Sequence, residues 1–243
     1  MRIWGKTDAG RERVDNQDNF FCESIMEDIV VFCLCDGMGG TNGGHIASKF
    51  ASVEFIRDIK KLIRPDISDD DAKIILSKAV LGANNIVYDM SSTDTNLAEM
   101  GTTLVGGFLI KDTVYIANVG DSRCYHISNN AILQVTKDHS LVQHLIDTGE
   151  ISDEERETHP QKNYITRAIG IANEILSDMY RFRFAQGEYI LLCSDGLYNL
   201  VSDEEIKDVV ASDRSLDEKC DILVQTANEN GGTDNITAVI LEF

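Results

Sequence analysis

Short apolar runs recur along the chain, rich in β-branched residues and bounded by Gly, Asp or Asn, and such runs predict β-strands. They occupy Ile29–Cys35, Thr103–Ile110, Val114–Val119, Tyr189–Cys193 and Ile236–Phe243. Short connections join the second run to the third, and join Arg123–Ile127 through Ser128-Asn129-Asn130 to Ile132–Val135. Consecutive hairpins of this kind indicate antiparallel sheet.

Apolar residues at helical spacing predict two long helices after the glycine-rich loop GMGGTNGG. The first helix has an apolar face formed by Ile46, Phe50, Val53, Ile56 and Ile63. The second has an apolar face formed by Ile75, Ala79, Val80, Ala83, Ile86 and Met90. Ser68 is a candidate N-cap for this second helix. Capping-box spacing predicts two further helix starts, at Ser202 with Glu205 and at Ser215 with Glu218.

The order of these elements favours an α+β fold, in which two antiparallel sheets pack face to face with helix pairs outside them. A chain of 243 residues is long enough for one large core. The sequence contains no repeat, low-complexity tract or linker, so residues 1–243 are expected to form a single domain.

The chain is acidic, with 41 Asp and Glu against 22 Lys and Arg and a formal charge of −19. This charge argues against binding to a nucleic-acid backbone, which needs clustered basic residues. No run approaches ~18 apolar residues and the N-terminus lacks a signal-peptide core, so a cytoplasmic protein without a membrane segment is expected. Of the six cysteines, Cys33, Cys35 and Cys193 lie in apolar runs and are expected to be reduced core residues.

Aspartates stand at the ends of the predicted strands. Asp36, Asp121 and Asp195 each follow an apolar run, Asp234 precedes the last one, and Asp18 precedes an aromatic pair that could open another strand. A single Asp at such a place is usually a turn residue. Five carboxylates gathered at one end of a sandwich would repel one another unless cations hold them. Oxygen ligands without His or Cys favour Mg²⁺ or Mn²⁺ over Zn²⁺.

Two residues that lie close to these acids in the sequence suggest how such a centre could act on phosphate. Gly37, which has no side chain, allows a sharp bend that can turn its carbonyl toward a cation. Two cations sharing one carboxylate would form a hydrolytic centre with a water made nucleophilic near neutral pH. Arg13 lies close to Asp18 in sequence and its planar fork can hold phosphate oxygens, although a solvated surface arginine is the alternative.

The motifs together resemble the bacterial-type metal-dependent protein phosphatases of the 2C class. They are, in order, TDAGRERVDNQD, CDGMGG, MGTT, VGDSR, KDHSLVQHLIDTGEI, HPQKNYITRAIG, CSDGL and GGTDNIT. Each segment alone is weak, but eight in the family's order and spacing span essentially the whole chain. The resemblance implies a four-layer αββα sandwich, with antiparallel helix pairs outside the sheets, that hydrolyses phosphoserine and phosphothreonine in proteins.

The resemblance also implies roles for the acids. Asp36 resembles the bridging metal ligand and Gly37 the carbonyl ligand, while Asp195 and Asp234 would complete the first metal's ligands. Asp18 would hold metal-bound water. The remaining implied roles are Asp121 as a ligand of a weaker third metal, Arg13 as the phosphate clamp, and His139–Ile165 as a flap beside the site.

Three positions depart from the family pattern without touching the metal ligands. Met38 stands where many eukaryotic members have histidine, Thr41 where bacterial members often have histidine, and His45 where many have glutamate. The proton donor to the leaving group is therefore either His45 or metal-bound water, and we expect it to be the water.

Other functions fit the sequence less well. No cysteine has an arginine six residues later, as a cysteine-based phosphatase would need, and the glycine loop lacks the GK[ST] of a P-loop. A catalytically dead module that keeps the fold remains the main alternative, although all the metal acids are present. A phosphatase acting on an anti-sigma-factor antagonist is close kin, but the long flap favours the general type. Expected partners are phosphoprotein substrates and an opposing Ser/Thr kinase, and the expected state is a monomer.

Overall fold

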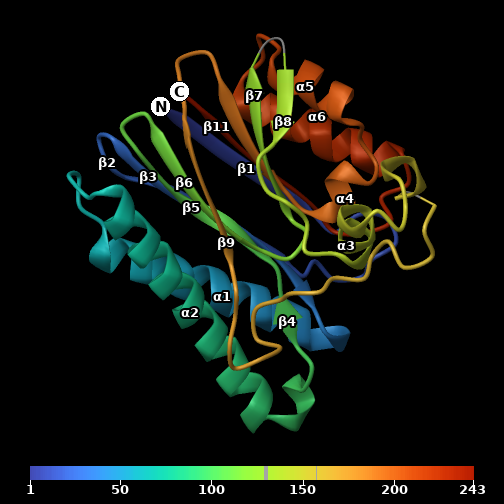
Figure 1. Cartoon of the computed structure of the whole chain (residues 1–243). Coiled ribbons are helices and arrows are strands. Elements are labelled where there is room, and N and C mark those ends of the chain that lie inside the picture. The colour runs from blue at the N-terminus through green and yellow to red at the C-terminus, as the bar shows by residue number, and fades with distance from the viewer. Residues whose placement is uncertain (129–130, 157) are drawn as a thin grey trace.

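The computed structural model describes residues 1–128, 131–156 and 158–243 and places their strands in two facing antiparallel sheets (Figure 1). The order in the first sheet is β1 (Arg2–Asp8), β11 (Ile236–Glu242), β10 (Tyr189–Cys193), β7 (Arg123–Ser128) and β8 (Ala131–Gln134). The order in the second is β2 (Asp18–Met26), β3 (Ile29–Met38), β5 (Leu104–Ile110), β6 (Thr113–Val119) and β9 (Asp178–Arg183), with the short β4 (Gly101–Thr102) beside the end of β3.

Helices cover the outer faces of both sheets (Figure 1). The pair α1 (Gly40–Leu62) and α2 (Asp69–Thr93) covers the second sheet, and α5 (Asp203–Val210) with α6 (Leu216–Glu229) covers the first. Shorter pieces are α3 (Leu141–Thr148), α4 (Asp195–Tyr198) and the 3₁₀ turns η1 (Thr95–Leu97) and η2 (Asp153–Glu155). The expected α+β sandwich with four layers is therefore confirmed. Among the helices that the structure describes, none is long and apolar enough to cross a membrane.

The caps predicted from the sequence are present. Ser68 forms a capping box with Asp71 at the start of α2. The two capping boxes predicted at Ser202 and Ser215 open α5 and α6. Each satisfies backbone N–H groups that a helix start leaves without partners. The tip of the β7–β8 hairpin, Asn129–Asn130, lies outside the described residues, but the two strands pair as expected.

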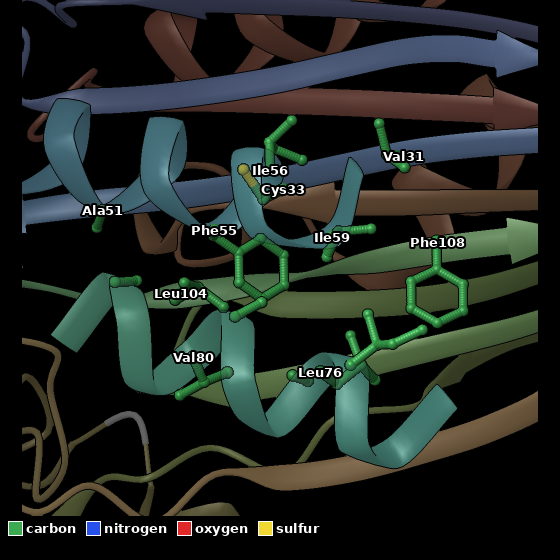
Figure 2. Close-up of a cluster of buried hydrophobic side chains, with 14 of the residues drawn as sticks. Val31, Cys33, Ala51, Phe55, Ile56, Ile59, Leu76, Val80, Leu104 and Phe108 are labelled. Carbon is green, nitrogen blue, oxygen red and sulfur yellow. The ribbon is translucent and has the colours of Figure 1, made fainter. Parts of the chain in front are cut away.

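Three apolar layers hold the sandwich together, one between the sheets and one under each helix pair. The layer under α1 and α2 is centred on Phe55, which has no solvent exposure and packs near Leu76, Val80 and Leu104 (Figure 2). Burying an aromatic side chain of this size contributes about 1.5–3 kcal/mol. This layer fixes α1, and with it the loop that leads from β3 into the helix.

The apolar face predicted for α1 is partly wrong. Phe50 and Val53 are 39% and 55% exposed, whereas Ala47, Ala51 and Phe55 are fully buried. Small residues let the helix approach the sheet closely, and the buried face also includes two serines whose hydroxyl groups are hydrogen-bonded to Gln17 O and Asn19 Oδ1. A prediction based on large apolar residues therefore places the face at the wrong angle.

Two strands at sheet edges are absent from the sequence prediction, β1 and β9. In β9, Tyr180 and Phe182 pack against the core between the sheets and alternate with Arg181 and Arg183. This alternation is typical of a half-buried strand, so the signal was present. The strand predicted at Ile29–Cys35 also continues to Met38.

Candidate active site

A cleft of about 600 Å³ opens at one end of the two sheets. Four of the predicted acids line it, Asp36, Asp121, Asp195 and Asp234, together with Arg13 and Gly37. Asp18 faces Asp36 across the β2–β3 ladder. The fold thus brings together seven residues that lie up to 221 positions apart in the chain.

Both sheets contribute to this cleft. Asp36 lies in β3, and Asp121 lies in the turn from β6 to β7. Asp195 opens α4 directly after β10, and Asp234 precedes β11. Because the acids stand at strand ends of two packed sheets, the sandwich itself sets their spacing.

Asp18 is the most deeply held of the acids, with 5% exposure. Its Oδ2 accepts hydrogen bonds from Ser194 Oγ at 2.7 Å and Thr237 Oγ1 at 2.6 Å. Its Oδ1 is buried and has no hydrogen-bond partner in the part of the chain that the structure describes. Burial is the main reason that the pKa of Asp18 rises to about 6. A buried lone oxygen of this kind is a site for a cation or for water attached to one.

Repulsion adds to burial at the other acids. Burial, and then the charges of Asp18 and Asp195, raise the pKa of Asp36 well above its ordinary value. Burial, and then the charges of Asp121 and Asp234, do the same for the pKa of Asp195. For Asp121, burial raises the pKa to about 6. Without cations the cleft therefore resists being fully ionised.

Among the described residues that line the cleft, Arg13 is the basic one. Its Nη2 donates to Asp234 Oδ2 at 2.8 Å, while its side chain is 57% exposed. That hydrogen bond is the largest cause of the raised pKa of Arg13. The guanidinium thus stands at the mouth of the cleft and is partly free to reorient.

Asn235 holds the loop that carries Arg13, a role that the sequence prediction missed. Its Nδ2 donates to Ala9 O and Asp15 O, each at 3.0 Å, and its Oδ1 accepts from Gln17 N at 2.9 Å. It follows Asp234 in the motif GGTDNIT, so the signal was its position beside a predicted ligand. One buried amide thereby connects both flanks of the Arg13 loop to the last strand.

Gly37 occupies a place where no side chain fits. A Cβ atom there would come within 2.2 Å of Gly44 O and 2.7 Å of Gln17 O. Its N–H donates to Gln17 O at 3.2 Å. Glycine is therefore required for the chain to pass from β3 into α1 beside Asp36.

The site fits hard divalent cations by the chemistry of its donors. Its donors are carboxylates from both sheets, including a buried oxygen of Asp18 that has no hydrogen-bond partner among the described residues. No described histidine or cysteine lines the cleft. Mg²⁺ and Mn²⁺ prefer oxygen ligands of this kind. Among the described residues, no three of these side chains already form a closed ligand group.

His45 does not line the cleft. Its side chain is exposed on α1, and it is not among the residues that line the site. The side chain of Thr41 lies outside what the structure describes. Whether His45 or metal-bound water supplies the proton therefore stays a prediction from the sequence.

The flap segment, residues 139–165, carries α3 and η2. Asn163 and Ile165 from its end line the cleft. Backbone hydrogen bonds join the beginning of the segment to its end. Leu141 N donates to Tyr164 O at 2.8 Å, and Thr166 N donates to His139 O at 2.8 Å. A capping box between Ser152 and Glu155 opens the 3₁₀ turn η2.

A four-layer sandwich with an acidic cleft at one end of its sheets is the architecture of the metal-dependent phosphatases. Residues 9–239 match the protein phosphatase 2C family, and the chain belongs to that family. The resemblance inferred from the motifs is thereby confirmed.

Several bacterial phosphatases are similar to this chain along its length. The serine/threonine phosphatase Stp of Listeria welshimeri is 39% identical over 98% of this chain and 94% of its own. Protein phosphatase PhpP of Streptococcus pneumoniae is 35% identical over 100% and 98%. The crystal structure of Stp1 from Staphylococcus aureus superimposes with a TM-score of 0.91 at 35% identity, covering 99% of this chain and 94% of that one.

Proposed function

We propose that this enzyme hydrolyses phosphoserine and phosphothreonine in proteins with two divalent cations, Mn²⁺ or Mg²⁺, and a weaker third. Membership of the protein phosphatase 2C family gives the enzyme class. The observation that carries the proposal is the meeting of five carboxylates from both sheets beside one arginine, with the pKa of Asp36 and of Asp195 raised by burial and mutual repulsion. Such a cleft attracts cations and, once they are bound, a phosphate dianion.

Each acid has a proposed role. Asp36 would bridge the two cations, with the Gly37 carbonyl, Asp195 and Asp234 completing the ligands. Asp18 would accept hydrogen bonds from water around the first cation, and Asp121 with Asp195 would hold the third. When bound, the cations supply a water that is nucleophilic near neutral pH and neutralise charge on the phosphate.

Arg13 would clamp the phosphate. Its exposed guanidinium has to leave Asp234 for this, and a hydrogen bond of 2.8 Å to Asp234 Oδ2 would have to break. A planar fork can donate two parallel bonds to phosphate oxygens. The clamp would thus exchange one carboxylate partner for the substrate.

The surroundings of the site suit a protein substrate. We take residues 1–243 as one catalytic domain, with the flap segment contributing Asn163 and Ile165 to the rim. Phosphoprotein substrates imply an opposing Ser/Thr kinase. A monomeric state and a cytoplasmic location stay predictions from the sequence.

The test is hydrolysis of a phosphoserine peptide by the purified protein. Activity should be lost in a chelator and return with Mn²⁺ or Mg²⁺, and Asp36→Asn should lower kcat by at least about a hundredfold. Asp208→Asn, at a residue whose side chain is 70% exposed on α5, is the matched control and should keep full activity. Full activity in excess chelator would refute the cation role, and Mn²⁺ binding without turnover would identify a binding module instead.

A further inference from the structure

Thr103, the last residue of the motif MGTT, holds the backbone of Asp36. The ladder between β3 and β5 ends at the pair Leu34 and Val105, and β3 then pairs with β4 from Gly37 onward. In the gap, Asp36 N donates to Thr103 Oγ1 at 2.9 Å, and Thr103 N donates to Asp36 O at 2.8 Å. A side-chain hydroxyl therefore takes the place of a ladder carbonyl at the residue that carries the central carboxylate.

The same hydroxyl reaches the turn that carries Asp121. Thr103 Oγ1 and Ser122 Oγ lie 2.7 Å apart, and either can be the donor. The rest of the side chain packs on the turn as well, because a Cβ atom on Gly120 would lie 2.7 Å from Thr103 Cβ and Cγ2. One buried threonine thus contacts both chain segments that place cleft carboxylates on this side.

These carboxylates repel each other, so the segments need a firm connection. The charge of Asp121 is among the causes that raise the pKa of Asp36. Thr103 is 3% exposed and Ser122 is 1% exposed, so water cannot replace the bond between them at low cost. Thr102 also holds the backbone of Asp36, because its Oγ1 donates a hydrogen bond to Asp36 O at 2.8 Å.

We propose that Thr103 is a positioning residue of the metal centre, whose hydroxyl fixes the distance between the Asp36 strand and the Asp121 turn. It acts through these backbone segments and needs no contact with substrate. This inference rests on the proposed function, because it assigns Thr103 to the same cation site.

Thr103→Val is the direct test, since valine keeps the shape and removes the hydroxyl. Thr103→Ser keeps the hydroxyl and removes the methyl group. Thr136→Val is the matched control: Thr136 is 3% exposed and its hydroxyl also accepts a backbone N–H, from Cys124 at 3.0 Å, but it does not line the cleft. The affinity for Mn²⁺ is measured by calorimetry on protein from which metal has been removed with a chelator. The kcat and KM for a phosphopeptide are measured on the same variants.

Thr103→Val should weaken Mn²⁺ binding by about tenfold or more and lower kcat, as loss of support behind metal ligands does. Thr103→Ser should restore most of both, and Thr136→Val should bind Mn²⁺ within about threefold of the original protein despite a similar loss of stability. Affinity unchanged in Thr103→Val, or lowered equally in Thr136→Val, would overturn the inference.

If Thr103→Val does not fold, Ser122→Ala decides the question. It breaks the link to Thr103 and should weaken Mn²⁺ binding by at least about threefold, whereas unchanged affinity would overturn the inference. Failure of the proposed function looks different, because the unmodified protein itself would then show no Mn²⁺-dependent hydrolysis.

Discussion

Removing the charge of Asp18 should stabilise the protein when cations are absent. The pKa of this carboxyl rises from 3.8 to about 6 on folding, mainly through burial. Between these values the folded state binds more protons than the unfolded state, so stability falls as pH rises and the cost is complete above about pH 6. Asp18→Asn removes this titration and can still accept from Ser194 and Thr237 through its amide oxygen.

The size of the effect follows from the shift. A change of about two pKa units corresponds to a cost of about 3 kcal/mol once the group is ionised in both states. Near about pH 5 roughly half of that cost has developed. Asp18→Asn should therefore be more stable than the unmodified protein in chelator, by about 3 kcal/mol near about pH 7.5 and about half as much near about pH 5.

Urea unfolding in chelator at several pH values measures this difference. Asp208→Asn, an exposed carboxylate, should shift stability by less than about 0.5 kcal/mol at every pH. Added Mn²⁺ should narrow the gap near neutral pH, since it binds the folded unmodified protein more tightly. A difference between Asp18→Asn and the unmodified protein that does not grow with pH would refute the argument from burial and repulsion.

Three further predictions concern single side chains. Phe55→Ala should cost about 3–5 kcal/mol in urea unfolding and Phe50→Ala, on the exposed side of α1, less than about 1; equal costs would contradict the observed helix face. Arg13→Ala should chiefly raise KM for a phosphopeptide, and an unchanged KM would exclude the clamp. His45→Ala should slow the hydrolysis of a phosphopeptide and of nitrophenyl phosphate by similar small factors. A tenfold loss of rate on the phosphopeptide alone, about 1.4 kcal/mol of activation barrier, would make His45 the proton donor.

The sequence by itself determined the features that depend on neighbouring residues. The capping boxes at Ser202 and Ser215 need only a residue and its partner three positions on, so their spacing was sufficient. The β-branched apolar runs of β3 and β11 were sufficient to predict two buried strands. The aspartates at strand ends could be recognised because each stands beside an apolar run in the sequence. The order of the motifs that contain them indicated the family.

Only the tertiary structure decided which surfaces meet. The buried face of α1 is made of small residues such as Ala47 and Ala51, because close packing on a sheet rewards small side chains that a pattern of large apolar residues does not weigh. The bond of Arg13 to Asp234 and the link from Asp36 through Thr103 to Ser122 join residues far apart in the chain. Such contacts arise from the packing of the two sheets, whose relative placement no local spacing in the sequence specifies.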